Sequence, residues 1–153
     1  PRGALFRQET ALRLSSLLAI TLICGHYEGI DERVSELFVD EEISIGDYVL
    51  TGGEIPAMAI VDAVVRLIPS VLGMDTCITG DSHYEGLLEH PQYTRPPEFS
   101  GLTVPEVLLS GDHDRIRRWR RKMAMLKTRS ARPDLFDKFE LSAEDQSILE
   151  EEE

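Results

Sequence analysis

The chain has 153 residues and a net charge of −12, with 42% hydrophobic and 29% charged residues. This composition is typical of a soluble globular protein, with enough apolar residues for one modest core, or for one core and a small helical appendage. The sequence contains neither an apolar run of about 18 residues nor a secretion-signal pattern, so it supports neither a membrane span nor export, and we expect a cytoplasmic protein.

The cysteines and histidines give no sign of a disulfide or a metal. Cys24 and Cys77 each lack a second cysteine at CxxC spacing, which is typical of reduced thiols. The four histidines do not fall at metal-ligand spacings such as HxxxH. We therefore predict no structural metal.

The first 72 residues alternate helical and strand patterns. Residues 10–18 have the spacing of a short helix, and the apolar run 20–24, which ends at Gly25, is typical of a buried parallel strand. A second helix and a second strand are predicted next, in the same order. Helical spacing returns at 31–38.

A second strand is indicated at 48–50, and the apolar residues between Pro56 and Pro69 repeat at helical spacing, with Pro56 in the first turn. Strand, helix, strand and helix in this order predict an α/β layer with right-handed crossovers. We therefore assign residues 1–72 to one α/β domain.

Beyond residue 72 the pattern changes. The apolar periodicity lapses, which indicates a linker at 73–83, and a mainly helical domain follows at 84–153. In that domain we predict a helix from about residue 113 to 127 and a last helix capped by Ser142. The first of these has an apolar stripe of Ile116, Trp119, Met123 and Leu126.

One short segment reverses the charge of the chain. Residues 115–132 contain nine arginine and lysine residues and no acid, so the rest of the chain carries −21. A solvated helix face is the ordinary interpretation of a charge run, but +9 inside an acidic protein favours a surface for RNA phosphates. We predict that its outward side chains are Arg115, Arg118, Arg121 and Lys122, whereas Trp119 belongs to the core.

Two glycine loops follow the two predicted strands. Gly-His-Tyr-Glu-Gly occupies 25–29 and Thr-Gly-Gly-Glu occupies 51–54. Open α/β sheets bind ligands at the carboxyl ends of strands, and glycine allows the backbone to approach a ligand closely. Neither loop has the spacing of a GxGxxG or GxxxxGK phosphate loop, so from the residues alone turn-forming glycine is the better interpretation.

Four longer strings are more specific than these loops. They are LICGHYEGIDERV (22–34), EISIGDYVLTGGEIPAMAIVDAVVRLIPSVLG (42–73), HPQYTRPPEFSGLTVPEVLLSGDH (90–113) and IRRWR (116–120). Over essentially the whole chain they resemble the bacterial tRNA (guanine-N1)-methyltransferases of the SPOUT class. The resemblance implies an α/β domain with a parallel sheet and a trefoil knot, followed by a small, mainly helical tRNA-binding domain. Because the family's chains carry further strands and helices before the position of Pro1, we expect this domain to be truncated at its N-terminus.

The resemblance also implies a pocket for S-adenosylmethionine between the glycine loops. One wall comprises Gly25, Tyr27, Glu28 and Gly29, and Pro1 belongs to the loop that covers the donor. The other wall comprises Ile45, Gly46, Tyr48, Leu50, Gly52, Gly53 and Pro56. Apolar walls and accessible backbone groups suit an adenosyl ligand. Without the resemblance, strand core is an equal interpretation of Tyr48 and Leu50.

Catalytic roles implied by the resemblance fall on Asp81, Arg66 and Glu28. Asp81 would be the general base that removes the proton from guanine N1, and Arg66 would stabilise the negative charge that develops on O6. From the residues alone, Asp81 favours a helix start, because Ser82 and Glu85 have capping-box spacing. Arg66 would equally well extend from its apolar helix to water.

The implied reaction is methyl transfer to N1 of guanine-37 of tRNA, next to the anticodon. The resemblance further implies a homodimer in which the partner subunit's Asp81 completes the donor pocket. Mg²⁺ dependence is reported for the family, although no ligand cluster in the sequence marks a site. Two alternatives stay open: a non-catalytic RNA-binding fragment, and an α/β enzyme that binds another nucleotide at the glycine loops.

Overall fold

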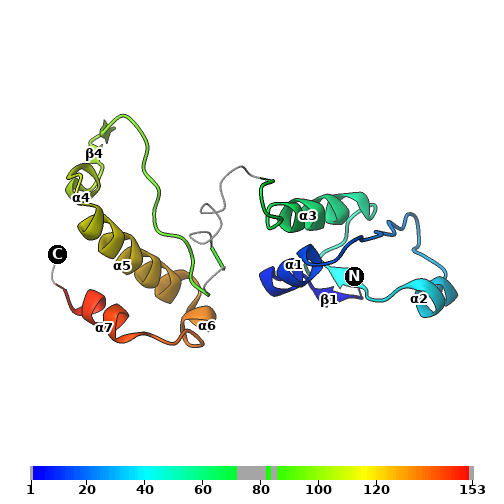
Figure 1. Cartoon of the computed structure of the whole chain (residues 1–153). Coiled ribbons are helices and arrows are strands. Elements are labelled where there is room, and N and C mark those ends of the chain that lie inside the picture. The colour runs from blue at the N-terminus through cyan, green and yellow to red at the C-terminus, as the bar shows by residue number, and fades with distance from the viewer. Residues whose placement is uncertain (1, 72–81, 84–85, 152–153) are drawn as a thin grey trace. The chain divides into compact units, whose positions relative to one another are not determined.

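The chain forms two compact units in a computed structural model that describes residues 2–71, 82–83 and 86–151 (Figure 1). The first unit comprises Pro1–Ile78 and the second Thr79–Glu153. In the described ranges no helix has the length and apolar character needed to cross a membrane. Most of the predicted linker, 73–83, lies outside the described residues, so its boundaries stay a prediction.

The first unit combines a parallel strand pair with helices. Strand β1 (Ala4–Leu5) pairs with β2 (Ile43–Ser44), with Ala4 opposite Ile43 and Leu5 opposite Ser44. Helices α1 (Gln8–Ser15) and α2 (Glu32–Phe38) lie between these strands in the sequence, and α3 (Glu54–Val65) follows β2. Parallel strands joined through helices agree with the predicted α/β class.

The core of this unit lies between α1 and α3. Ala11 and Leu14 from α1 are buried against Ile60 and Val64 from α3. Both pairs have the three- or four-residue spacing that puts side chains on one helix face. Partly buried residues around this core are Phe6, Ile43, Ile45, Ala63 and Leu67. The packing fixes the middle and end of α3 against α1, and the second glycine loop leads directly into this helix.

The helices of the first unit follow the sequence pattern closely. The side chain of Asp31 caps α2 by accepting a hydrogen bond from the backbone N–H of Arg33 at 3.0 Å. Pro56 lies in the first turn of α3, as predicted. This helix ends at Val65, four residues before Pro69, and α1 begins and ends slightly earlier than its predicted range.

The two strands predicted from the sequence are wrong. Residues 20–24 and 48–50 carry no strand, and the described chain beside them forms only an isolated antiparallel bridge between His26 and Gly52. Ile20 and Ile23 are 40% and 51% exposed, so the apolar run is not buried. An apolar run becomes a strand only where a neighbour supplies hydrogen-bond partners, and here β1 and β2 pair instead.

The second unit is mainly helical and includes one antiparallel hairpin. Positive φ angles at Ser100 (51°) and Gly101 (79°) form its two-residue turn. Helix α5 packs against α4, α6 and α7 (Figure 1). The elements are β3 (Glu98–Phe99), β4 (Leu102–Thr103), α4 (Glu106–Leu109), α5 (His113–Ala131), α6 (Pro133–Phe136) and α7 (Ala143–Glu150).

Three buried side chains, Leu87, Met125 and Ile148, form the centre of the second core. Thr128 is also fully buried, and its hydroxyl donates to the carbonyl of Ala124 at 2.7 Å. The same oxygen accepts a hydrogen bond from the backbone N–H of Leu88 at 2.8 Å. The hydroxyl of Thr128 is therefore fully hydrogen-bonded, and it attaches the segment around Leu88, which precedes the hairpin, to α5.

Helix α5 extends the predicted helix by four residues, to Ala131. The predicted apolar stripe of Ile116, Trp119, Met123 and Leu126 is only half buried. Met125 and Thr128, which were not in the stripe, are the buried residues of this helix. The buried face is therefore rotated around the helix from its predicted position.

Candidate functional site

The two glycine loops of the first unit lie against each other. The backbone N–H of Gly53 donates to the carbonyl of Gly25 at 3.1 Å, and His26 and Gly52 form the antiparallel bridge. A Cβ on Gly53 would lie 2.7 Å from Cα of Cys24, so a larger residue would displace the backbone there. The sequence brings together two loops that are more than twenty residues apart, with main-chain atoms in close contact.

A side-chain pair that sequence analysis missed also joins these loops. Nε2 of His26 hydrogen-bonds Oε1 of Glu54, and both side chains are about half exposed. The pKa of Glu54 is lowered, first by a hydrogen bond from its own backbone N–H and then by the bond to His26. The two residues are 28 positions apart, so no short motif could have indicated the pair.

The first predicted wall of the donor pocket is a turn. Gly29 has a φ of 126°, in the region that favours glycine, and its N–H donates to the carbonyl of His26 at 3.1 Å. Tyr27 has a φ of 57°, and its side chain and that of Glu28 are exposed. The loop thus presents an aromatic ring and a carboxylate to solvent beside the loop contact.

The second predicted wall begins where β2 ends. The hydroxyl of Tyr48 donates to the carbonyl of Ile45 at 3.4 Å, and a Cβ on Gly46 would lie 2.3 Å from Cε1 of the tyrosine ring. Tyr48 and Leu50 are 54% and 37% exposed, so the interpretation of these two residues as strand core is wrong. Gly52, Gly53 and Pro56 continue this wall into α3.

Of the three predicted catalytic residues, two lie in the described part of the chain. Arg66 is the C-cap residue of α3 and lines a surface cavity of about 410 Å³ together with Asp62 and apolar side chains of that helix. Glu28 is in the first glycine loop. Asp81, Pro1 and residues 84–85 of the predicted capping box lie outside the described residues, and their roles stay predictions.

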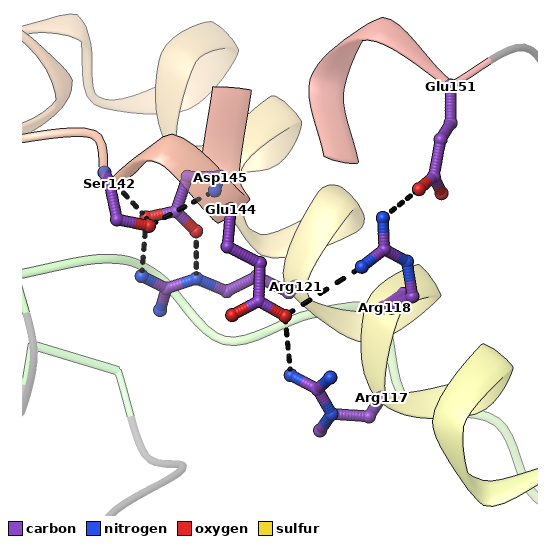
Figure 2. A network of polar contacts seen from close by, with 7 residues as sticks. All are labelled: Arg117, Arg118, Arg121, Ser142, Glu144, Asp145 and Glu151. Carbon is purple, nitrogen blue, oxygen red and sulfur yellow. Dashed lines mark hydrogen bonds and ion pairs between the residues drawn. The ribbon is translucent and has the colours of Figure 1, made fainter. Parts of the chain in front are cut away.

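Helix α5 of the second unit turns several of its cations toward acids of α7 (Figure 2). Nη1 of Arg117 lies 3.0 Å from Oε1 of Glu144. Arg118 pairs with Glu151 and lies 3.8 Å from Glu144. The pairing with Arg118 lowers the pKa of Glu151.

Three of the four predicted RNA-contacting residues therefore have partners within the unit. Besides Arg118, the ammonium of Lys122 donates to the backbone carbonyl of Glu151. Arg121 contacts Asp145, with Nε 2.7 Å from Oδ1. Arg115 is exposed, and within the described part of the chain its guanidinium has no partner, whereas its backbone N–H donates to Oδ1 of the N-cap residue Asp112 at 3.1 Å.

Arg121 points inward, and the outward orientation predicted for it is wrong. Its guanidinium lies 5.3 Å from the centroid of the Phe139 ring and holds a carboxylate, that of Asp145, that is almost fully buried. Ser142 donates to the same carboxylate through its backbone N–H and its hydroxyl, at 3.1 and 2.9 Å. These contacts, with Arg121 the largest, lower the pKa of Asp145 to about 2.

Comparison with known proteins identifies the family. A model of the tRNA (guanine-1)-methyltransferase family TrmD matches residues 1–138, and the chain belongs to this family. In the described ranges, no group of three His, Cys, Asp or Glu side chains could hold a metal ion.

Three curated relatives carry the name tRNA (guanine-N(1)-)-methyltransferase. The relative from Desulforamulus reducens is 56% identical over 97% of this chain and 59% of its own length. Those from Geotalea uraniireducens and Dictyoglomus turgidum are 57% and 58% identical, each over 99% of this chain and 61% of the relative. The chain thus spans about three fifths of the length of the curated relatives that it matches.

Proposed function

We propose that this chain acts in a tRNA methyltransferase that transfers a methyl group from S-adenosylmethionine to N1 of guanine-37. The contact between the two glycine loops carries this proposal, because it provides a main-chain site within a sequence whose relatives are named for guanine-N1 methylation. The knotted SPOUT fold, the homodimer with a composite site and the cytoplasmic location belong to the same proposal.

The residues at the loop contact fit an adenosyl ligand. A Cβ on Gly52 would lie 2.5 Å from a carboxylate oxygen of Glu54, and one on Gly53 would lie 2.7 Å from Cα of Cys24, so glycine is what lets the two loops approach each other with their main chains accessible. The exposed Tyr48 and Leu50 would supply apolar contact to the adenine. S-adenosylmethionine supplies a methyl group on a positively charged sulfur, ready for transfer to a nucleophile.

The protein's own residues would then prepare the nucleophile. Guanine N1 carries a proton at neutral pH, and in this proposal the carboxylate of Asp81 accepts it. Arg66, at the exposed end of α3, donates hydrogen bonds to O6, where negative charge develops as the proton leaves. Glu28, in the first loop, would orient the reacting groups. Dependence on Mg²⁺ belongs to the same proposal.

The second unit would bind the tRNA anticodon stem-loop through α5. Arg115 is exposed and available for a phosphate. Arg118 and Lys122 would reach phosphates by exchanging their contacts with Glu151, and Arg121 would support the surface from within by holding α7. Electrostatic contacts of this kind dominate the affinity of proteins for nucleic acids.

The catalytic assignment is tested by single-turnover methylation of tRNA in the complete enzyme. We expect Asp81→Ala and Arg66→Ala to lower the rate by roughly 100-fold or more while donor affinity, measured by calorimetry, is unchanged. Asp40→Ala and Arg7→Ala, which alter exposed residues of the same types, are matched controls and should keep the normal rate. Near-normal rates for both site variants would refute the assignment.

An RNA-binding role without catalysis is the second candidate, and it is favoured by the nine cations of residues 115–132. The two functions differ in their ligands. Calorimetry of the 153-residue chain with S-adenosylmethionine gives heat of binding under the first and none under the second, with tRNA affinity retained in both.

A further inference from the structure

A cavity of about 370 Å³ lies entirely within the second unit, between the proline-rich segment 90–97 and helices α4 and α5. Its size is that of small-ligand pockets. Val104 and Leu108 form an apolar part of the lining, whereas Gln92, Arg95 and Arg120 give it a polar and cationic part. The functional roles assigned above use none of these residues.

In the part of the chain that the structure describes, the two arginines of this cavity, Arg95 and Arg120, lack the acid partners that three arginines of α5 have. Arg117, Arg118 and Arg121 are all paired with acids on or next to α7. Arg95 and Arg120 are exposed, and within the described ranges no hydrogen bond or ion pair engages either guanidinium. Two unneutralised guanidinium groups at one cavity favour a negatively charged ligand, because they bind phosphate oxygens through paired N–H groups.

An aromatic ring faces the same cavity. Tyr93 lines it and is 48% exposed, and its ring is tilted against Trp119 with 6.3 Å between the ring centroids. The contact with Trp119 restricts the ring on one side and leaves the rest of it accessible. Aromatic rings presented in this way beside arginines are the usual platform for unpaired bases.

The backbone of this segment also has free hydrogen-bonding groups. Pro91, Pro96 and Pro97 bracket residues 92–95, which are in neither a helix nor a strand. Among the described residues, the backbone N–H groups of 92–95 have no hydrogen-bond acceptor. A row of unpaired donors at a cavity edge can bind the carbonyl and ring-nitrogen acceptors of a base.

We propose that this cavity binds one unpaired nucleotide of the RNA substrate, distinct from the guanine that is methylated. Its base stacks on Tyr93, and its phosphate contacts Arg95 and Arg120. This inference rests on the proposed function, since it takes RNA as the substrate. It adds a second recognition point, which would select RNAs with an exposed nucleotide at a fixed distance from the target.

Trp119 provides a direct readout, because it is the only tryptophan of the chain and contacts Tyr93. The whole 153-residue chain is titrated with a short single-stranded oligoribonucleotide of anticodon-loop sequence, and tryptophan fluorescence is recorded. We expect a saturable change in fluorescence. Tyr93→Ala should weaken binding about tenfold, whereas Tyr93→Phe, which keeps the ring, should bind normally.

The phosphate contact is tested by a second pair of variants. Arg120→Gln should weaken binding and reduce the slope of log affinity against log salt by about one. Lys138→Gln removes the same charge from an exposed position outside the cavity and should change neither quantity. Because Arg120 is exposed and makes no contact with the core cluster, this variant tests the inference even if Tyr93→Ala does not fold.

Two results would overturn the inference. One is oligonucleotide binding by Tyr93→Ala and Arg120→Gln as tight as that of the parent chain. The other is an equal fluorescence change with inorganic phosphate at the same concentrations, which would make the cavity a simple anion site. The failure of the proposed reaction looks different, because the complete parent enzyme would then show no methyl transfer to tRNA while the fluorescence change of the 153-residue chain is retained.

Discussion

Asp145 supplies a buried carboxylate that links helices α5 and α7 of the second unit. Its side chain is 3% exposed, and a buried carboxylate destabilises a fold unless hydrogen bonds replace its water. Two guanidinium nitrogens of Arg121 and both donors of Ser142 supply these bonds. Ser142 could be predicted from sequence as an N-cap, but the partner Arg121 could not, since it lies 24 residues earlier.

This contact predicts acid sensitivity of the second unit. The pKa of Asp145 is lowered from 3.8 to about 2, so the folded state favours the ionised carboxylate. Stability from this group is therefore fully present above about pH 4 and is lost as the pH falls toward 2, by on the order of 2 kcal/mol. Urea unfolding followed by Trp119 fluorescence at pH 7 and at low pH measures the difference.

Variants isolate the contribution of Asp145 from those of other acids. Asp145→Asn should lower the free energy of unfolding at pH 7 and should lose less stability on acidification than the parent chain. Asp137→Asn, at an exposed acid of the same unit, should keep the parent's pH dependence. An Asp145→Asn variant with the parent's full acid sensitivity would contradict the assignment.

Gly53 carries the loop contact of the first unit. A Cβ there would lie 2.7 Å from Cα of Cys24, and backbone atoms cannot move aside as a flexible side chain can. Gly53→Ala should therefore destabilise the unit by roughly 1–3 kcal/mol and weaken S-adenosylmethionine binding. Thr51→Ala, at an exposed position of the same loop, is the control. Thermal unfolding and calorimetry measure both effects, and unchanged donor binding in Gly53→Ala would argue against a site at this contact.

At the scale of elements, local patterns predicted helices well and strands poorly. Helices α2, α3, α5 and α7 depend on spacing, proline and capping residues within a few positions, which the sequence shows directly. The strands at 20–24 and 48–50 required partners elsewhere in the chain, and an apolar run does not specify its partner. The parallel pair that does form, β1 with β2, is too short to give a strand pattern.

The same limit explains the rotated face of α5. Helical spacing identified an amphipathic helix, but which cations face outward depends on α7, whose acids are more than twenty residues away. The same limit applies to the candidate site, because its contacts join residues that are far apart in the sequence. The contact between glycine loops was foreseeable from the family resemblance but not from the strands predicted before them, which do not form. The His26–Glu54 pair and the Tyr93 cavity came only from the tertiary structure.

The pairing of α5 with α7 predicts that acids of α7 compete with RNA. Glu144 is about half exposed and lies near both Arg117 and Arg118, so its loss should change stability little, by about 1 kcal/mol or less. Glu144→Gln should free Arg117, remove the weaker of the two acid contacts of Arg118, and raise tRNA affinity by a fewfold at low salt. Glu140→Gln removes an exposed acid that has no cation partner in the described chain and should have a smaller effect. Equal affinities for both variants would show that α7 does not oppose RNA binding.

Across the whole molecule, charge is segregated. The chain carries −12, yet residues 115–132 carry +9. The structure reduces the part of that charge available to RNA, because four of its arginines pair with acids: Arg117, Arg118, Arg121 and Arg132. Within the described ranges, the cations of this segment without an acid or carbonyl partner are Arg115, Arg120, Lys127 and Arg129.

This count predicts the salt dependence of tRNA binding. Each neutralised phosphate contributes about 0.7–0.9 to the slope of log affinity against log salt, so the four available cations alone predict a slope of about −3 to −4. Exchange of Arg118 and Lys122 onto phosphates would bring it to about −4 to −5, and all nine cations would give about −6 to −8. Filter or fluorescence binding of the 153-residue chain to tRNA over a series of salt concentrations measures it. A charge reversal on the first unit, Arg7→Glu, should leave the slope unchanged, whereas Arg115→Gln should reduce its magnitude by about one. A slope of about −6 to −8 would mean that RNA also displaces the acids that hold Arg117, Arg121 and Arg132, and a slope near zero would remove α5 from the binding surface altogether.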